Sequence, residues 1–300
     1  MKLKNKREIS GNTMLDVLIA LLPAVLVSFV YFGTKAIILV AVSVISAALA
    51  EYLWCKIFKK ENSLWDLSFV VTGVLIALNV SSLVPFWAVA IASVVAIIIG
   101  KMIFGGAGKN IINPAVLGII ILMIFFYNSM NNFADPFQWF TKSDTILTPP
   151  PLSAEDGAFS PLQLLFGLHK GAMGETSSVI LLLGGLYLVL RKVINPIIPL
   201  SFIGSVALLS FAFSENILIS VFSGSLILVA IFMATDYATS PSKPLMQLGY
   251  GIGCGILTFI LRRFTPIYEG TIIALLIMNI LLFIGKKIYD YIHKNRKLKI

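Results

Sequence analysis

The stretch MATDYATSPSKP, residues 233–244, places a carboxylic acid and several hydroxyl groups between two long apolar runs. Asp236 directly follows Thr235 and is separated by two residues from Thr239, so three oxygen-bearing side chains gather on one short segment. Oxygen ligands suit a hard cation such as Na⁺, and a carboxyl group can also carry a proton. An acid at membrane depth is costly and is a candidate for function by default. The alternative is a helix cap at the membrane surface, with Lys243 as a nearby counter-charge.

A second polar stretch, GGAGKNIINPA (105–115), joins glycines to amide side chains. Gly106 and its glycine neighbours allow close approach of the backbone, while Asn110 and Asn113 precede a helix with Pro114 in its first turn. The free N–H groups at such a helix start suit an anion or a polarised carbonyl group. Close packing of helices through the glycines is the alternative.

The sequence shows no motif for a metal cluster. Cys55 and Cys254 lie far apart without a CxxC motif, and the histidines are His169 and His293. An iron–sulfur cluster, a zinc site or a haem pair is therefore not expected from this chain alone. Two buried structural thiols are the simpler interpretation.

The elements that must position these residues are membrane helices. Of the 300 residues, 58% are hydrophobic and 12% are charged, whereas about a quarter of an ordinary soluble domain is charged. Lipid should therefore surround most of the chain. The first apolar run follows KLKNKR and has no cleavage pattern after it, which indicates a membrane helix rather than a signal peptide. The apolar runs predict ten spans: 14–32, 36–55, 66–79, 85–103, 112–127, 177–190, 196–213, 217–234, 245–261 and 270–289.

The net charge of +9 reports membrane topology rather than a nucleic-acid partner. With the N-terminus in the cytoplasm, most Lys and Arg residues fall on the cytoplasmic side of these spans, which is the positive-inside bias. Arg262 and Arg263 are the local exception. We therefore expect a multi-pass protein of a bacterial or archaeal cytoplasmic (inner) membrane, with both termini in the cytoplasm and the lipid bilayer as its main surroundings.

Two segments resemble each other and indicate an internal repeat. ALNVSSLVP (77–85) matches ATDYATSPS (234–242): both place Asn79 or Asp236 two residues after an alanine, before hydroxyl residues and a proline. Because each half holds five spans, the second half is expected upside down relative to the first. The Asn79 break would then face outside and the Asp236 break the cytoplasm. Inverted repeats with broken helices are typical of transporter-like folds, although ordinary loops with a chance match would explain the same pattern.

The sequence therefore predicts an all-α integral membrane protein of two inverted five-helix repeats with broken helices. The predicted parts are a first repeat over 1–127, an extracytoplasmic loop over 128–176, and a second repeat with a basic cytoplasmic tail over 177–300. Two further acids, Asp16 and Glu51, are weaker functional candidates, because placement at the membrane interface explains both.

Four stretches together resemble one family along nearly the whole chain. GGAGKNIINPA (105–115) looks like the signature of the D subunit of the Rnf ion-translocating ferredoxin:NAD oxidoreductase. It also resembles that of the homologous B subunit of the sodium-translocating NADH:quinone reductase. MLDVLIALLPA (14–24), GAMGETSSVILLLGGLYLVLRKVI (171–194) and MATDYATSP…GYGIGCGILTFILRRF (233–264) are similar to further family segments and occur in the same order. The short N-terminus looks more like the Rnf branch.

The resemblance implies a membrane flavoprotein whose FMN is linked through its phosphate to a threonine in the outer loop. The nearest match to the attachment motif is ILTPPPL (146–152), which makes Thr148 the candidate. Ile146 and Leu147 stand where the family motif has small residues for a flavin transferase to read. Covalent FMN, non-covalent flavin and loss of this flavin are therefore all open.

The resemblance also brings other polar residues into the flavin question. Thr176 and Ser177 in GETS (174–177) follow the flavin loop, and would either bond a flavin phosphate or ring edge or cap the next helix. Asp236, or the asparagines near Gly106, would hydrogen-bond a second flavin such as riboflavin.

The function that follows is an electron-carrying subunit of an ion-translocating complex, which passes electrons through FMN and is coupled to Na⁺ or H⁺ movement near Asp236. Such a subunit is not catalytic alone and needs membrane and peripheral partner subunits and the flavin transferase. Two alternatives of other classes stay open. The chain would be a small-solute channel or transporter if it carries no redox group, or a flavin-free scaffold subunit if the flavin has been lost.

Overall fold

The computed structural model describes residues 6–61, 63–141, 152, 159–175, 177–265 and 270–297, and these ranges are helical without a β-strand. The first half contains α1 (Lys6–Phe32), α2 (Thr34–Ile57), the 3₁₀ turn η1 (Leu64–Asp66), α3 (Ser68–Leu78), α4 (Phe86–Ile97), the π-helix η2 (Ile98–Met102) and α5 (Pro114–Phe125). Helix α5 begins where the sequence indicates: Asn113 accepts a bond from the Ala115 N–H at 3.0 Å, and Pro114 occupies the first turn.

The second half has the same kind of elements and one more interruption. It contains α9 (Ser178–Leu190), α10 (Ile197–Ala212), α11 (Ile217–Phe222), α12 (Leu226–Leu228), the π-helix η5 (Val229–Met233), α13 (Pro244–Phe264) and α14 (Gly270–Lys297). Between the halves, the described residues form the short elements α6 (Tyr127–Met130), α7 (Gln138–Thr141), α8 (Pro161–Phe166) and the 3₁₀ turn η4 (Met173–Glu175). Helix α8 has a capping box, in which Ser160 and Gln163 bond each other's backbone.

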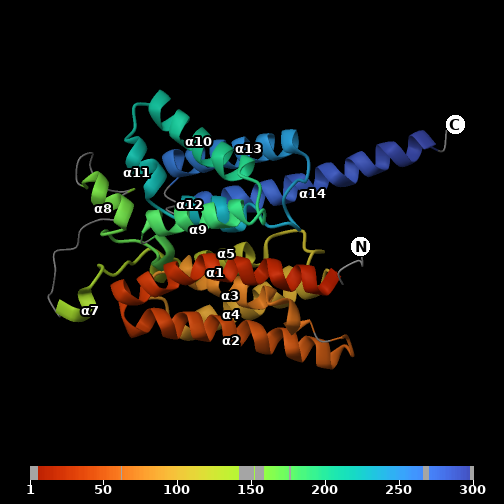
Figure 1. Ribbon diagram of the computed structural model, residues 1–300, viewed down its shortest axis with the longest axis horizontal. Helices are drawn as coiled ribbons and strands as arrows, with labels where there is room; N and C mark the ends of the chain where they lie inside the picture. Colours follow the sequence, from red (N-terminus) through yellow and green to blue (C-terminus); the bar gives the residue numbers. More distant parts are fainter. Residues whose placement is uncertain are drawn as a thin grey trace.

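The long helices run roughly side by side, with α1 and α9 near the middle of the bundle (Figure 1). Helix α2 packs on α3 and α4, and α4 packs on α5; in the second half α10 packs on α11 and α13, and α13 packs on α14. The packing partners therefore follow the same order in both halves. The inverted relation of the halves stays a prediction.

Small residues allow the central helices to approach closely. A side-chain carbon at Gly184 on α9 would lie 2.6 Å from the carbonyl oxygen of Ala20 on α1. On α13, Gly251 and Gly255 lie directly against the hydroxyl groups of Ser201 and Ser205 on α10. Spacing of small residues by four positions is a common way for membrane helices to associate, because it brings the backbones together.

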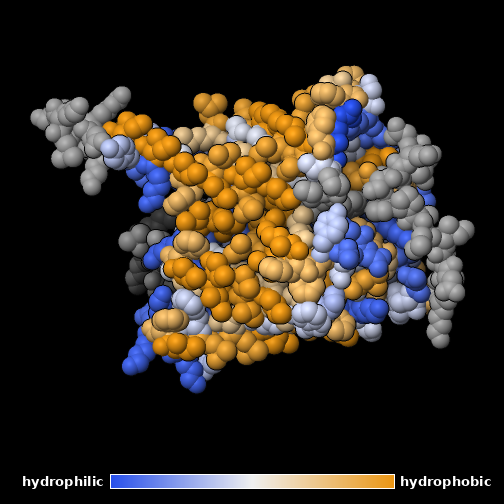
Figure 2. Space-filling model, turned by 180° about the vertical axis from the view of Figure 1, so that it is seen from behind, coloured by the Kyte–Doolittle hydropathy of each residue, from blue (hydrophilic) through white to orange (hydrophobic). Residues whose placement is uncertain are grey.

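The surface has the distribution of a membrane protein. Figure 2 shows an apolar band across the middle of one face, with hydrophilic residues toward both ends. Among the described residues, four segments are long and apolar enough to cross a bilayer: Asn12–Phe32, Thr34–Ile57, Pro244–Phe264 and Gly270–Ile292. The same part of the chain holds five shorter apolar helices of 10–17 residues. The prediction of an all-α, multi-pass membrane protein is confirmed, with several predicted spans present as shorter helices.

The ends of the chain are arranged as expected relative to each other. Helix α1 begins and α14 ends at one end of the bundle, while α7 and α8 lie at the opposite end (Figure 1). Which of these ends faces the cytoplasm stays a prediction.

The predicted continuous span 217–234 is wrong, because the helix is broken at residues 223–225 between α11 and α12. Gly224 has φ +67°, which favours glycine. The guanidinium group of Arg262 donates to the carbonyl oxygens of Ser220 at 2.8 Å and Ser223 at 3.2 Å, and to the Thr271 hydroxyl at 3.0 Å. Arg262, an exception to the charge bias, therefore satisfies carbonyl groups at the end of a broken helix.

Candidate functional site

A cavity of about 90 Å³ lies between the two halves of the chain, with polar groups in its wall. The first half contributes the start of α3, Lys101 on η2 and the glycine-containing loop before α5; the second half contributes η5 and the segment around Asp236. Both π-helices therefore end beside the cavity. Single π-turns inside α-helices are frequent at functional sites.

Asp236 lies in this wall, just after the end of η5, and neutral donors surround its carboxylate. The Asn110 side-chain amide donates to it at 3.3 Å, the Thr239 hydroxyl at 3.2 Å and the Ala238 backbone N–H at 3.3 Å. Thr235 also lines the cavity, although its hydroxyl donates to the carbonyl oxygen of Ile231 one turn earlier. The structure therefore brings Asn110, predicted as a flavin ligand, to the segment of Asp236, Thr235 and Thr239, so that an amide of one half contacts the acid of the other.

Asn113 fixes the loop of the first half against the broken helix of the second. Its side-chain amide donates to the carbonyl oxygen of Met233 at 3.2 Å, and its backbone N–H donates to the Asn279 side chain at 2.9 Å. Asn279 in turn donates to the Tyr250 hydroxyl at 2.7 Å. These bonds satisfy a carbonyl group at the end of η5, so the irregular backbone there is stabilised by protein groups rather than by water.

The two matched breaks meet inside the molecule. Asn79 follows α3, and its side-chain nitrogen lies 2.8 Å from the carbonyl oxygen of Leu75 and 3.5 Å from the sulfur of Met233. The side-chain oxygen of Asn79 is buried without a hydrogen-bond partner among the described residues. Asn79 contacts the segment that leads to Asp236 but is not part of the cavity wall. Its predicted place in an ion path therefore stays a prediction.

The cavity is small for a flavin. Its volume holds a few water-sized molecules, whereas pockets for larger organic ligands measure about 300–1,000 Å³. Asn110 and Asn113, predicted as ligands of a second flavin, are both engaged by protein groups. Gly106 has φ +97°, and a side-chain carbon there would meet no atom within 4 Å. In this arrangement the cavity has room for a small cation or for water, and Gly106 does not belong to its wall.

The residues predicted near the outer-loop flavin are only partly described. Thr148 and Thr176 lie outside the described residues. Ser177 is buried and precedes α9 with φ +69°, and it makes no side-chain capping bond to that helix. The simple capping interpretation of Ser177 is therefore wrong, and its predicted contact with flavin stays a prediction.

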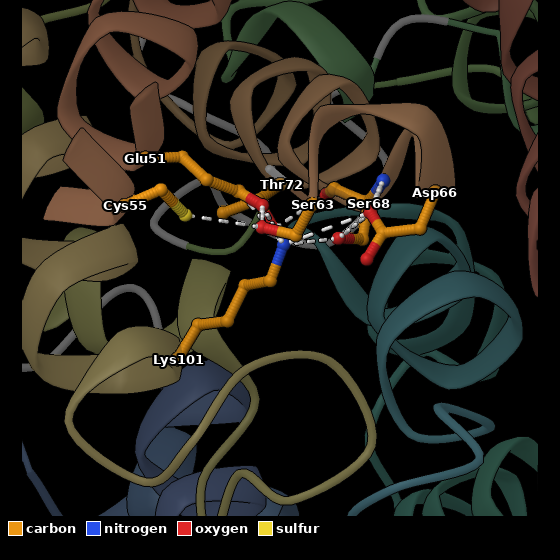
Figure 3. A network of polar contacts seen from close by, with 7 residues as sticks. All are labelled: Glu51, Cys55, Ser63, Asp66, Ser68, Thr72 and Lys101. Atoms are coloured by element: carbon orange, nitrogen blue, oxygen red, sulfur yellow. Dashed lines mark hydrogen bonds and ion pairs between the residues drawn. The ribbon is translucent and has the colours of Figure 1, made fainter. Parts of the chain in front are cut away.

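The sequence does not predict the buried ion pair between Glu51 and Lys101, which Figure 3 shows. Glu51 is fully buried, and both its oxygens accept bonds from the Lys101 ammonium group, at 2.8 and 2.7 Å. Glu51 is therefore paired inside the protein, and its place at the membrane interface stays a prediction. The usable signal is an acid and a lysine inside apolar runs, where unpaired charges are rare. Asp16 accepts bonds from Tyr187 at 2.9 Å and from the exposed Arg191, and its interfacial placement also stays a prediction.

A bundle of apolar helices, broken where polar side chains line a cavity between its halves, defines the chain as a multi-pass membrane protein with a partly buried acid in that cavity. Its sequence also matches the profile of the NQR2, RnfD, RnfE family over residues 3–293, and the chain belongs to this family.

The relatives are named as D subunits of translocating complexes. The D subunit of the Na⁺-translocating ferredoxin:NAD⁺ oxidoreductase complex of Acetobacterium woodii is 38% identical over 278 residues, which cover 90% of this chain and 86% of the relative. The D subunit of the proton-translocating ferredoxin:NAD⁺ oxidoreductase complex of Clostridium ljungdahlii is 32% identical and covers 90% and 87%. The D subunit of the ion-translocating oxidoreductase complex of Rhodobacter capsulatus is 33% identical and covers 84% and 82%.

Proposed function

We propose that this chain is the D-type membrane subunit of an ion-translocating ferredoxin:NAD oxidoreductase complex. Membership of the family, together with relatives of that name aligned over 86% or more of both chains, supports this role. In this role the subunit carries FMN on the outer side, exchanges electrons with partner subunits, and contributes a path for Na⁺ or H⁺ that passes Asp236.

The observation that carries the ion path is the setting of Asp236. Its carboxylate lies in the wall of a cavity between the two halves, and its partners Asn110, Thr239 and Ala238 are uncharged. Because neutral donors leave the charge of a carboxylate uncompensated, a cation or a proton that enters the cavity can compensate it. The broken helix end beside it adds oxygen atoms of the kind that bind hard cations.

The ion path is tested by Asp236→Asn in the assembled complex. Transport of Na⁺ or H⁺ into inverted membrane vesicles, driven by reduced ferredoxin and NAD⁺, should fall by about tenfold or more relative to the amount of complex, because the neutral amide no longer attracts a cation. Asp290→Asn, the same change at an exposed acid on α14, is the matched control and should leave transport unchanged. Normal transport by the Asp236→Asn complex would refute the path.

The flavin is tested separately. The resemblance assigns FMN to Thr148 through a phosphate ester, and a flavin attached in this way keeps its fluorescence after denaturation. The protein, co-expressed with a flavin transferase, should give a fluorescent band on a denaturing gel. Thr148→Ala should abolish the band, and Thr145→Ala, a hydroxyl removed three positions earlier, should keep it. A dark wild-type band would exclude covalent attachment.

A second function has structural support of its own. Paired helix breaks around a small polar cavity also suit a solute channel or transporter without a redox group. The purified native protein separates the two functions: flavin absorbance supports the electron-transfer subunit, whereas its absence together with solute flux into liposomes supports the channel.

A further inference from the structure

Lys101 is a buried cation held almost entirely by side-chain oxygens. It is 2% exposed, and its ammonium group donates to both oxygens of Glu51, at 2.8 and 2.7 Å, and to the Ser68 hydroxyl at 2.5 Å. A carboxylate oxygen of Asp66 lies 3.7 Å away. Figure 3 shows these side chains converging on the ammonium nitrogen from separate elements, η2, α2, η1 and α3.

The network contains more negative than positive charge. Two carboxylates, Glu51 and Asp66, share one ammonium group, and each is held further by hydroxyl groups. The Ser63 hydroxyl donates to Glu51, and the Ser68 hydroxyl and backbone N–H donate to Asp66 at 2.6 and 2.9 Å. The carboxylates are therefore fixed in place, while the lysine reaches them on a long flexible side chain.

The same lysine borders the cavity of Asp236. Lys101 and Ser68 belong to the cavity wall, together with Asn110 and Asp236. A positive charge in this wall acts on any cation that enters, because the surroundings are apolar and screen charge weakly. Glu51 opposes that effect, because its carboxylate neutralises the ammonium group.

A structural role alone does not account for this arrangement. A buried ion pair contributes little stability compared with apolar side chains of similar size, and intramembrane charges mark functional paths. Lys101 also lies on the π-helix η2, a local irregularity common at functional sites. Position, charge and local geometry all connect it to the cavity.

We propose that Lys101 is a tethered internal cation that sets the affinity of the Asp236 cavity for the translocated cation, and that Glu51 holds and neutralises it. This inference rests on the proposed ion path and adds a regulator of its affinity. The charge of Lys101 disfavours a second cation in the cavity, and the charge of Glu51 favours one.

The test measures the Na⁺ concentration that half-activates ferredoxin-driven NAD⁺ reduction by the purified complex, at ionic strength held constant with choline chloride. If Na⁺ does not activate the wild-type complex, the same quantity is measured for H⁺ from the pH profile. Lys101→Met should lower the half-activating concentration by about fivefold, because an unopposed Glu51 remains. Glu51→Gln should raise it, because the ammonium group then keeps only the carboxylate of Asp66, at 3.7 Å, as a counter-charge.

Two further variants separate charge from structure. Lys101→Arg keeps the charge and should stay near the wild-type value, and the double variant Lys101→Met with Glu51→Gln removes both charges and should return toward it. Lys60→Met, which removes an exposed lysine near the end of α2, should change nothing. Lower yields with unchanged half-activating concentrations in all variants would show a purely structural pair and overturn the inference.

Asp236→Asn, measured in the same series, distinguishes the ion path from its regulator. If Asp236→Asn shifts the cation dependence but the single Lys101 and Glu51 variants do not shift it in opposite directions, the inference fails and the proposed ion path stands. If Asp236→Asn leaves both the cation dependence and transport unchanged, the path itself fails, and the inference fails with it.

Discussion

A buried carboxylate, Glu51, and a partly buried one, Asp236, are held in opposite ways in the same bundle. Glu51 lies within the long helix α2 and is compensated by the ammonium group of Lys101 at 2.7 Å. Asp236 follows a broken helix and is held by three neutral donors in the wall of a cavity. One acid carries its own counter-cation, and the other is held by neutral groups of the described chain.

This difference distinguishes Glu51, a carboxylate paired with a lysine of the same chain, from Asp236, a carboxylate that a cation or proton entering the cavity can compensate. An ion pair inside a helix bundle is rigid, because breaking it leaves an uncompensated charge in an apolar medium. A carboxylate held by neutral donors keeps its position whether or not a cation is present. The helix break supplies this second setting, because its free backbone groups and turn residues replace a charged partner.

The largest effect on stability is expected when one partner of the Glu51–Lys101 ion pair is removed. Glu51→Gln or Lys101→Met should each lower the free energy of unfolding by about 3–5 kcal/mol, because each removes one partner of a buried ion pair. The double variant should lose less than the sum of the two. Denaturant titration of the protein in detergent measures all three. If the free energy of unfolding of the single variants stayed within about 1 kcal/mol of the wild-type value, Glu51 and Lys101 would not depend on each other for stability.

Arg262 extends the comparison to a cation that donates to backbone carbonyl groups at a helix break. Arg262→Met leaves the carbonyl oxygens of Ser220 and Ser223 without their donor, and should cost about 2–3 kcal/mol of unfolding free energy. Arg263→Met is the matched control at the next position. Its ion pair with Glu215 is 38% and 31% exposed, so its loss should cost about 1 kcal/mol or less. Equal losses in the two variants would show that the helix break does not depend on Arg262.

Neutralising Asp236 should have little effect on stability. Asp236→Asn keeps an oxygen that accepts from Asn110 and Thr239, and these partners are neutral. The free energy of unfolding should therefore change by about 1 kcal/mol or less, although transport falls. The same denaturant titration checks it. A loss as large as that of Glu51→Gln would mean that Asp236 has a charged partner in the bundle.

The smallest effect concerns a buried imidazole in the segment between the two halves. His169 is 3% exposed, its Nδ1 lies 3.0 Å from the carbonyl oxygen of Lys170, and burial lowers its pKa below the ordinary value of 6.5. The unfolded chain therefore binds a proton more readily than the folded one. The stability contribution is fully present above about pH 6.5 and is lost as the pH falls toward the folded pKa.

We therefore expect the melting temperature of the wild type to fall between pH 7.5 and pH 5.5 by about 1–3 °C more than that of His169→Gln. Differential scanning fluorimetry of both proteins in detergent measures the difference. Identical pH dependence of the two would show that His169 does not contribute to it.

Much of the fold follows from local sequence signals. Apolar runs of sufficient length predict membrane helices, and Pro85, Asn113 and Pro244 mark helix starts that the structure confirms. The break at residues 223–225 has no clear local signal, because serine and glycine are also common inside continuous membrane helices. Only the reach of Arg262 from α13 shows that the carbonyl groups there are free of helical bonds.

The sequence by itself determined the class of protein, the family and the polar segment around Asp236, because length, hydropathy and motifs are local properties of the chain. The tertiary structure alone decided which polar groups meet. Asn110 contacts Asp236 from 126 residues away, and Lys101 contacts Glu51 from 50 residues away. Each polar side chain has several partners compatible with its own helix, and only the packing of the helices selects one. For that reason Glu51 resembles an interfacial acid in the sequence, whereas the fold makes it the buried partner of a lysine beside the cavity.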